Sequence, residues 1–241
     1  MTPLAPPRRA LMRLPPFPER LLRALSPAGE RHGLLLAGGH ALRAHGFTDR
    51  LVEGLDLVTA AEGPLPSAAG DVVAALRAGG LVAEVAESAV WAARLTVTDP
   101  SSGRDAEIVL TREALREPPV VCDGLPVAAP ADVIGLRVRD LHERGLPADV
   151  ADAASAAHVF SFRDLERLAA VHLDDFSPQE LLMRLEFVEL MSDERFEAHG
   201  LDERHIADIR AFAREWAEDI KLRRADDGDA DYDDPDLPEV D

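Results

Sequence analysis

Cysteine, lysine and aromatic side chains are scarce in this chain of 241 residues. Its lone cysteine, Cys122, has no partner for an internal disulfide, which is typical of a reducing compartment, so we expect a cytoplasmic protein. No apolar run reaches the ~18 residues that a membrane-spanning helix needs. The proline-broken start also contains no apolar core of signal-peptide length. These absences argue against a membrane partner.

Positive charge is in short supply as well. Lys and Arg total 26 against 45 Asp and Glu, which gives a net charge of −19. Non-specific nucleic-acid binding depends on neutralising phosphates, so we expect no broad nucleic-acid binding. A local basic site is compatible with this balance.

Several common catalytic signatures are missing. The chain contains no GxSxG motif, no P-loop and no zinc-ligand spacing. His40 and His45 bracket one short predicted helix, but residues five apart do not share a helix face well. The histidines therefore predict no metal site with Cys122 or with one another.

The stretch from Gly33 to Leu57 organises the rest of the chain. It predicts a buried apolar strand over 34–37, a turn at Gly38 and Gly39, a helix of about two turns, and a second strand that carries Asp56. Bare backbone N–H groups at the start of a helix favour an anion such as phosphate. An ordinary strand-turn-helix of an α/β domain is the alternative interpretation.

This stretch resembles the opening motif of the bacterial nucleotidyltransferase-like toxins of the abortive-infection AbiEii/AbiGii family. That motif has an apolar strand, Gly-Gly, a small-residue helix, an arginine and an Asp-x-Asp strand. The matching residues here are 36–42, Arg50 and Asp56, while the first aspartate of the pair falls on Gly54. The resemblance implies a nucleotidyltransferase fold in which Gly38, Gly39 and Arg50 bind nucleotide and Asp56 is catalytic.

A second signature of the family follows about 95 residues later. In the family it comprises a lysine on a helix, a following arginine, and Arg-Asp-x-x-Asp at the next helix start. Arg137 stands at the lysine position and Ala148 at the arginine position, while Asp149 and Asp152 match the aspartates. The resemblance implies a nucleotide-binding role for Arg137 and a catalytic role for Asp149. Asp149 also suits a simple helix N-cap, which is the competing interpretation.

The metal-binding carboxylates are incomplete. Nucleotidyl transfer needs a divalent metal, and Mg²⁺ takes oxygen ligands from neighbouring strands. The third carboxylate position of the family falls on Val109, and Glu53 points to the wrong face to replace Gly54. Glu107 shares the face of Val109 but lies roughly 6.8 Å away along the strand, so it reaches the metal only by extension or simply faces solvent. We therefore expect Mg²⁺ to bind weakly, through Asp56 and Glu107.

The predicted fold class is α+β: a nucleotidyltransferase-like mixed sheet with flanking helices, followed by a helical C-terminal domain. The expected divisions are an N-terminal arm and helix over 1–29, the α/β domain over 30–118, the helical domain over 119–224, and an acidic disordered tail over 225–241. The first helix is expected to end near Pro27. The tail carries aspartates and a glutamate without basic counterweight, so burial cannot offset its ordering entropy.

The sequence thus favours a nucleotidyltransferase-like protein whose NMP transfer is weak or lost, because carboxylates are missing at Gly54 and Val109. An active nucleotidyltransferase that modifies RNA, protein or a small molecule is one alternative. A non-catalytic binding or regulatory protein on this fold is another, and an unrelated α/β scaffold is the last. The expected partners are a nucleoside triphosphate and an antitoxin-like protein.

Overall fold

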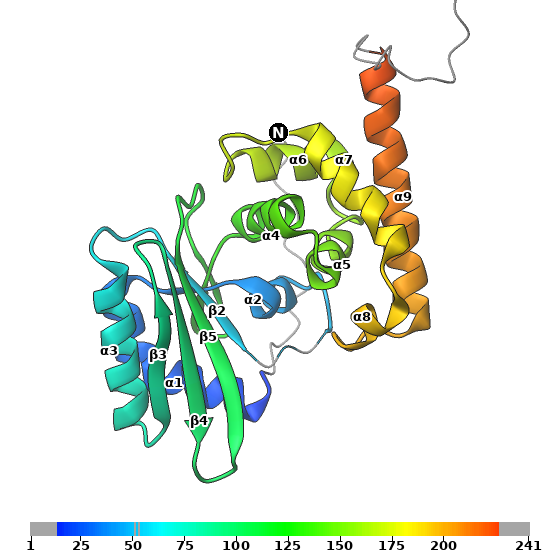
Figure 1. Ribbon diagram of the computed structural model, residues 1–241. Coiled ribbons are helices and arrows are strands. Elements are labelled where there is room, and N and C mark those ends of the chain that lie inside the picture. The colour runs from blue at the N-terminus through cyan, green and yellow to red at the C-terminus, as the bar shows by residue number, and fades with distance from the viewer. Residues whose placement is uncertain (1–13, 51, 53, 227–241) are drawn as a thin grey trace, which may run out of the picture.

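The computed structural model describes residues 14–50, 52 and 54–226. The strands, shown with the helices in Figure 1, are β1 (Leu35–Leu36), β2 (Leu55–Thr59), β3 (Val82–Ser88), β4 (Ala92–Asp99), β5 (Arg104–Arg112), β6 (Val120–Cys122) and β7 (Leu125–Val127). The helices are α1 (Pro16–His32), α2 (Gly38–Ala44), α3 (Leu65–Ala78), α4 (Pro130–Arg144), α5 (Pro147–Ser155), α6 (Phe162–Ala170), α7 (Pro178–Phe187), the short 3₁₀ helix η1 (Val188–Leu190), α8 (Asp193–Glu197) and α9 (Glu203–Asp226).

The strands form one mixed sheet in the order β3-β4-β5-β2-β1-β7-β6. β2 pairs with β5 in parallel and with β1 in antiparallel orientation, so β2 lies at the centre. The strand expected over 34–37 and the expected strand that carries Asp56 are therefore neighbours. The α+β class with a mixed sheet is confirmed.

Two helices cover one face of the sheet. α3 packs against β3, β4 and β5 and against α1, and Figure 1 shows both helices on the same side of these strands. The strand side chains that point toward them are fully buried, such as Leu95, Ile108 and Leu110. On the other face α2 and α4 pack near β2, while Arg94 and Thr96 of β4 stay exposed. The part of this second face that β4 forms is thus exposed to solvent.

The C-terminal helices form a second layer around α4. α4 contacts α5, α6 and α7, and α9 packs against α5 and α7. Trp216 of α9 is fully buried, stacks on the Phe162 ring and donates a 2.9 Å hydrogen bond to Glu166. A buried indole N–H needs such a partner, so this contact fixes α9 on α6. Within the residues that the structure describes, no helix combines the length and apolar character that crossing a membrane requires.

Three boundaries differ from the sequence prediction. The sheet continues beyond residue 118 through β6 and β7, because a tight turn at Asp123 and Gly124 returns the chain beside β1. α1 runs past Pro27 to His32, since its turns after the proline pack Ala28 into the core. Residues 225 and 226 of the expected tail are the last of α9. The rest of that tail, 227–241, and the N-terminal arm up to residue 13 lie outside the described residues.

Candidate functional site: the Asp56–Arg137 cluster

Asp56 lies on the central strand β2, directly above the start of α2. The Ala37 N–H donates a 2.8 Å hydrogen bond to the Asp56 carbonyl, which holds the Gly-Gly turn against β2. Gly38 has φ +60°, and a Cβ atom there would lie 1.7 Å from Asp56 Oδ2 and 2.2 Å from Arg137 Nη2. Only glycine leaves this space free for the two side chains. Gly38 therefore contributes to the site by leaving room for the Asp56 and Arg137 side chains to meet.

Arg137 of α4 is the centre of the site. Its Nη2 donates to Asp56 Oδ2 at 2.5 Å and its Nη1 to Asp140 Oδ2 at 3.0 Å, while Nε lies 3.5 Å from Asp152 Oδ2. Its side chain is only 15% exposed. Burial alone would lower the pKa of Arg137, but the carboxylates of Asp56, Asp152 and Asp140 raise it above its usual value. The guanidinium is thus charged and already surrounded by anions.

Arg50 and Asp152 extend the cluster. The Arg50 Nη2 donates to Asp152 Oδ1, so Asp152 bridges the two arginines. Burial raises the pKa of Asp152 although Arg137 and Arg50 oppose the shift. The cluster thus comprises two arginines with Asp56, Asp140 and Asp152, and Asp140 is also bound from outside it by Arg139 and Arg144. We call these five residues the Asp56–Arg137 cluster.

Val109 occupies the place beside Asp56 on the neighbouring strand. The two residues are register partners in the parallel pair of β2 and β5, so their side chains share a face. Glu107 lies two residues further along β5, where Arg94 Nη1 holds its carboxylate at 3.1 Å on the exposed sheet face. A Cβ atom at Gly54 would lie 2.9 Å from the Glu107 carbonyl oxygen. The strands approach closely where the missing aspartate would stand.

Asp149 stands apart from Asp56. Its Oδ2 accepts the Leu146 N–H at 3.1 Å, and its Oδ1 accepts from Arg144 Nη2 at 2.6 Å. Asp149 is therefore not the N-cap that the sequence suggested: Leu146 is the N-cap of α5, and Asp149, three residues later, accepts the N–H of that residue in a capping box. Arg144 also reaches Asp140 at 3.1 Å, which links this cap to the edge of the Asp56–Arg137 cluster.

His40 and Asp140 are neighbours of the site that no sequence motif indicates. His40 lies on α2 with the backbone of Gly54 and the Asp56 charge beside it, and only 1% of it is exposed. Burial, followed by the Arg43 charge, lowers the pKa of His40, so the ring is neutral. Asp140 follows Arg137 by three residues, a spacing that places both on one helix face, and this spacing was a usable signal.

A resident Mg²⁺ does not fit the described residues. The donor set near Asp56 is one carboxylate already bound by Arg137, together with Asp140 and Asp152, which the same guanidinium contacts. Among residues 14–50, 52 and 54–226, no group of three or more His, Cys, Asp or Glu side chains is arranged to hold a metal. We therefore derive no chemical step through a metal ion. Glu53 lies outside the described residues.

No protein-family model matches the chain, and no curated protein matches it by sequence. Solved structures do resemble it. MenT4, a nucleotidyltransferase toxin of Mycobacterium tuberculosis, matches with a TM-score of 0.55 at 18% identity, over 87% of this chain and 90% of that chain. JHP933 of Helicobacter pylori matches with a TM-score of 0.51 at 17% identity, over 88% and 95% of the two chains.

Another H. pylori protein, proposed to be a nucleotidyltransferase, matches with a TM-score of 0.52 at 20% identity, over 85% of this chain and 95% of that chain. At these identities the likeness shows the fold. The chain has the fold of nucleotidyltransferase toxins, as the sequence motifs predict. Membership of the AbiEii/AbiGii family stays a prediction.

Proposed function

We propose that this chain is a nucleotidyltransferase-like protein that binds a nucleoside triphosphate weakly and transfers NMP weakly or not at all. The observation that carries the proposal is the register of β2 and β5, in which Val109 is the partner of Asp56. An apolar side chain thus stands where a second metal-binding carboxylate would be adjacent to the first. Asp56 alone cannot hold and position a metal for attack by a hydroxyl group.

The charges of the Asp56–Arg137 cluster support weak binding of a triphosphate. A phosphate that approaches Arg137 has to displace Asp56 or Asp152 from the guanidinium, because both occupy it already. A guanidinium binds a phosphate through the same paired N–H groups with which it binds a carboxylate. The remaining carboxylates repel the incoming phosphates, so affinity stays low. Arg50 offers a second cation once Asp152 moves.

An active nucleotidyltransferase that modifies RNA, protein or a small molecule is the second candidate. The likeness to the nucleotidyltransferase toxin MenT4 and the retained Asp56 favour it. It differs from the first proposal in requiring nucleotide transfer that depends on Asp56. An antitoxin-like partner belongs to either proposal and follows from the resemblance alone.

Calorimetric titration with each of the four nucleoside triphosphates tests the binding half of the proposal, with and without Mg²⁺. We expect dissociation constants of about 1 mM, which corresponds to about −4 kcal/mol. Arg137→Gln should abolish binding, Arg137→Lys should retain part of it, and Arg94→Gln on the open sheet face should leave it unchanged. A melting curve for each variant verifies folding. Binding that survives Arg137→Gln, or no binding by the wild type, contradicts the proposal.

A further inference from the structure

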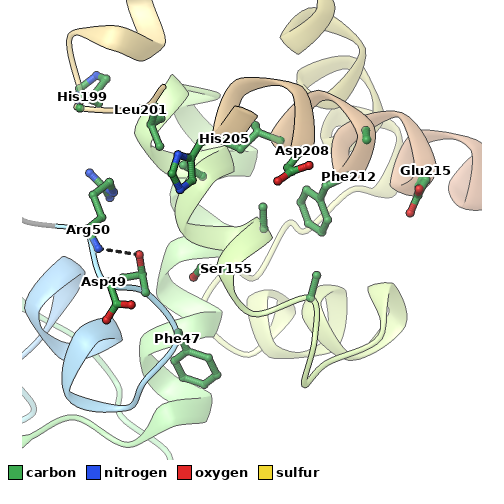
Figure 2. Close-up of a pocket in the computed structure, with 17 residues that line it drawn as sticks. Phe47, Asp49, Arg50, Ser155, His199, Leu201, His205, Asp208, Phe212 and Glu215 are labelled. Atoms are coloured by element: carbon green, nitrogen blue, oxygen red, sulfur yellow. Dashed lines mark hydrogen bonds between the residues drawn. The ribbon is translucent and has the colours of Figure 1, made fainter. Parts of the chain in front are cut away.

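A groove with a volume of about 960 Å³ runs between α5, the start of α9 and the loop 47–50. Figure 2 shows Asp208, Phe212 and Glu215 in succession along α9, with Arg50 and Ser155 also lining the groove. We call it the α5–α9 groove. Arg50 is the residue that it shares with the Asp56–Arg137 cluster.

The two helical walls differ in character. α9 lines the groove with Asp208 and Glu215, which are seven residues apart and therefore lie on one face, about 10.5 Å apart along the axis. Phe212 lies between them and is buried at the base. α5 contributes Ala151 and Ala154, whose small side chains let another backbone approach closely. The groove thus has an apolar floor and an acidic edge.

The acidic residues of the groove lack counter-ions. Within the described part of the chain, Asp49, Asp208 and Glu215 make no ion pair. Acidic residues further along α9 behave differently: Glu218 is bound by Lys221 at 3.3 Å and Asp219 by Arg223 at 2.8 Å. Arg50 gives no compensation, because Asp152 occupies its guanidinium. Among the described residues, the groove therefore presents three carboxylates without an ion-pair partner, while His205, which also lines it, pairs with Asp202.

We infer that the α5–α9 groove binds a basic amphipathic α-helix of a partner protein. A helical segment of ten residues is about 15 Å long, so it spans the roughly 10.5 Å that separate Asp208 from Glu215 along α9. The apolar face of this helix packs on Phe212 and the alanines of α5. Its Lys or Arg side chains, two turns apart, pair with Asp208 and Glu215, whose spacing along α9 is the same.

Fluorescence anisotropy on the full chain tests the inference. The probe is a labelled 14-residue peptide of Ala and Leu with two arginines seven positions apart. Asp208→Asn with Glu215→Gln should weaken its binding at least about five-fold, since each exposed pair contributes modestly. The matched control, Glu62→Gln with Glu84→Gln, removes the same charge from exposed positions outside the groove and should change binding less than two-fold.

A second variant tests the shape of the groove without altering its charge. Ala157 lines the groove and is exposed, so Ala157→Trp obstructs the groove without disturbing the core, and it should abolish binding. A peptide with glutamates in place of the arginines should not bind. The inference is overturned if the control substitutions weaken binding as much as the groove substitutions do, because that result would indicate general attraction of a basic peptide to an acidic protein. It is also overturned if Ala157→Trp has no effect, or if spermine binds the groove and the peptide does not.

Discussion

Neutralising Asp56 should strengthen the binding of a metal-free triphosphate, the opposite of what loss of a catalytic aspartate does. Asp56→Asn removes one of the three carboxylates that hold Arg137. A charge-assisted hydrogen bond contributes roughly 1.5–3 kcal/mol. Because the Asp56 side chain is 41% exposed, solvent screening reduces this to about 1 kcal/mol. At 1.4 kcal/mol per factor of ten, we expect about five-fold tighter binding.

The assay is calorimetric titration of ATP into wild type and Asp56→Asn with a chelator present, at low and moderate salt. Glu107→Gln is the matched control, since it removes a charge from the same sheet face but from a carboxylate held by Arg94. We expect this control to bind as the wild type does. Equal or weaker ATP binding by Asp56→Asn would refute the reasoning that Asp56 competes with phosphate for Arg137.

Three further predictions concern the site and the fold. Val109→Asp places a carboxylate about 4.8 Å from Asp56 across the strand pair. Calorimetry should then show stronger Mg²⁺-dependent binding of ATP. Unchanged binding would contradict the assignment of position 109 as the missing metal ligand. Gly135→Ala should lower the free energy of unfolding by about 2 kcal/mol, because its Cβ would lie 2.6 Å from the Leu168 carbonyl oxygen. Urea titrations of both variants measure this change. Gly70→Ala, whose added Cβ would have nothing within 4 Å, should instead raise the free energy of unfolding by about 0.5–1 kcal/mol. A Gly135→Ala variant more stable than Gly70→Ala would contradict the packing of α4 on α6. Burial is the main cause of the lowered pKa of three histidines, which stay neutral in the folded chain. In the unfolded chain the same histidines bind protons once the pH drops below the ordinary pKa of 6.5. The free energy of unfolding should therefore decrease as the pH is lowered from about 7 to about 6, and an increase over this interval would refute the prediction. These histidines are His40, His45 and His172.

The centre of the fold was predictable because its signals are local. An apolar run followed by Gly38 and Gly39 indicates a strand and a sharp turn, and a lone carboxylate between leucines places Asp56 on the face away from them. The strands β6 and β7 have three residues each, too few for a periodic pattern, so they were not predictable from the sequence. The helix through Pro27 depends on packing of α1, which a local rule cannot anticipate.

The partners within the site were harder to predict because they are distant in sequence. Asp56 and Arg137 are 81 residues apart, and Arg50 and Asp152 are 102 apart. Motif resemblance named Arg50, Arg137 and Asp56. The ion pairs of the two arginines with Asp152, and of Arg137 with Asp56, arise only when α4 and α5 pack beside β2. Competition between carboxylates and phosphate for one guanidinium is therefore a conclusion from the structure.

The measurement that tests the central claim most directly is a transfer assay. Wild type and Asp56→Asn are incubated with labelled nucleoside triphosphates, Mg²⁺ and a pool of total RNA and cell lysate as acceptors. Because Val109 stands where a second carboxylate would adjoin Asp56, we predict that labelling by the wild type is weak at most and close to that of Asp56→Asn. Robust labelling of an acceptor by the wild type that disappears in Asp56→Asn would contradict the account and establish an active nucleotidyltransferase.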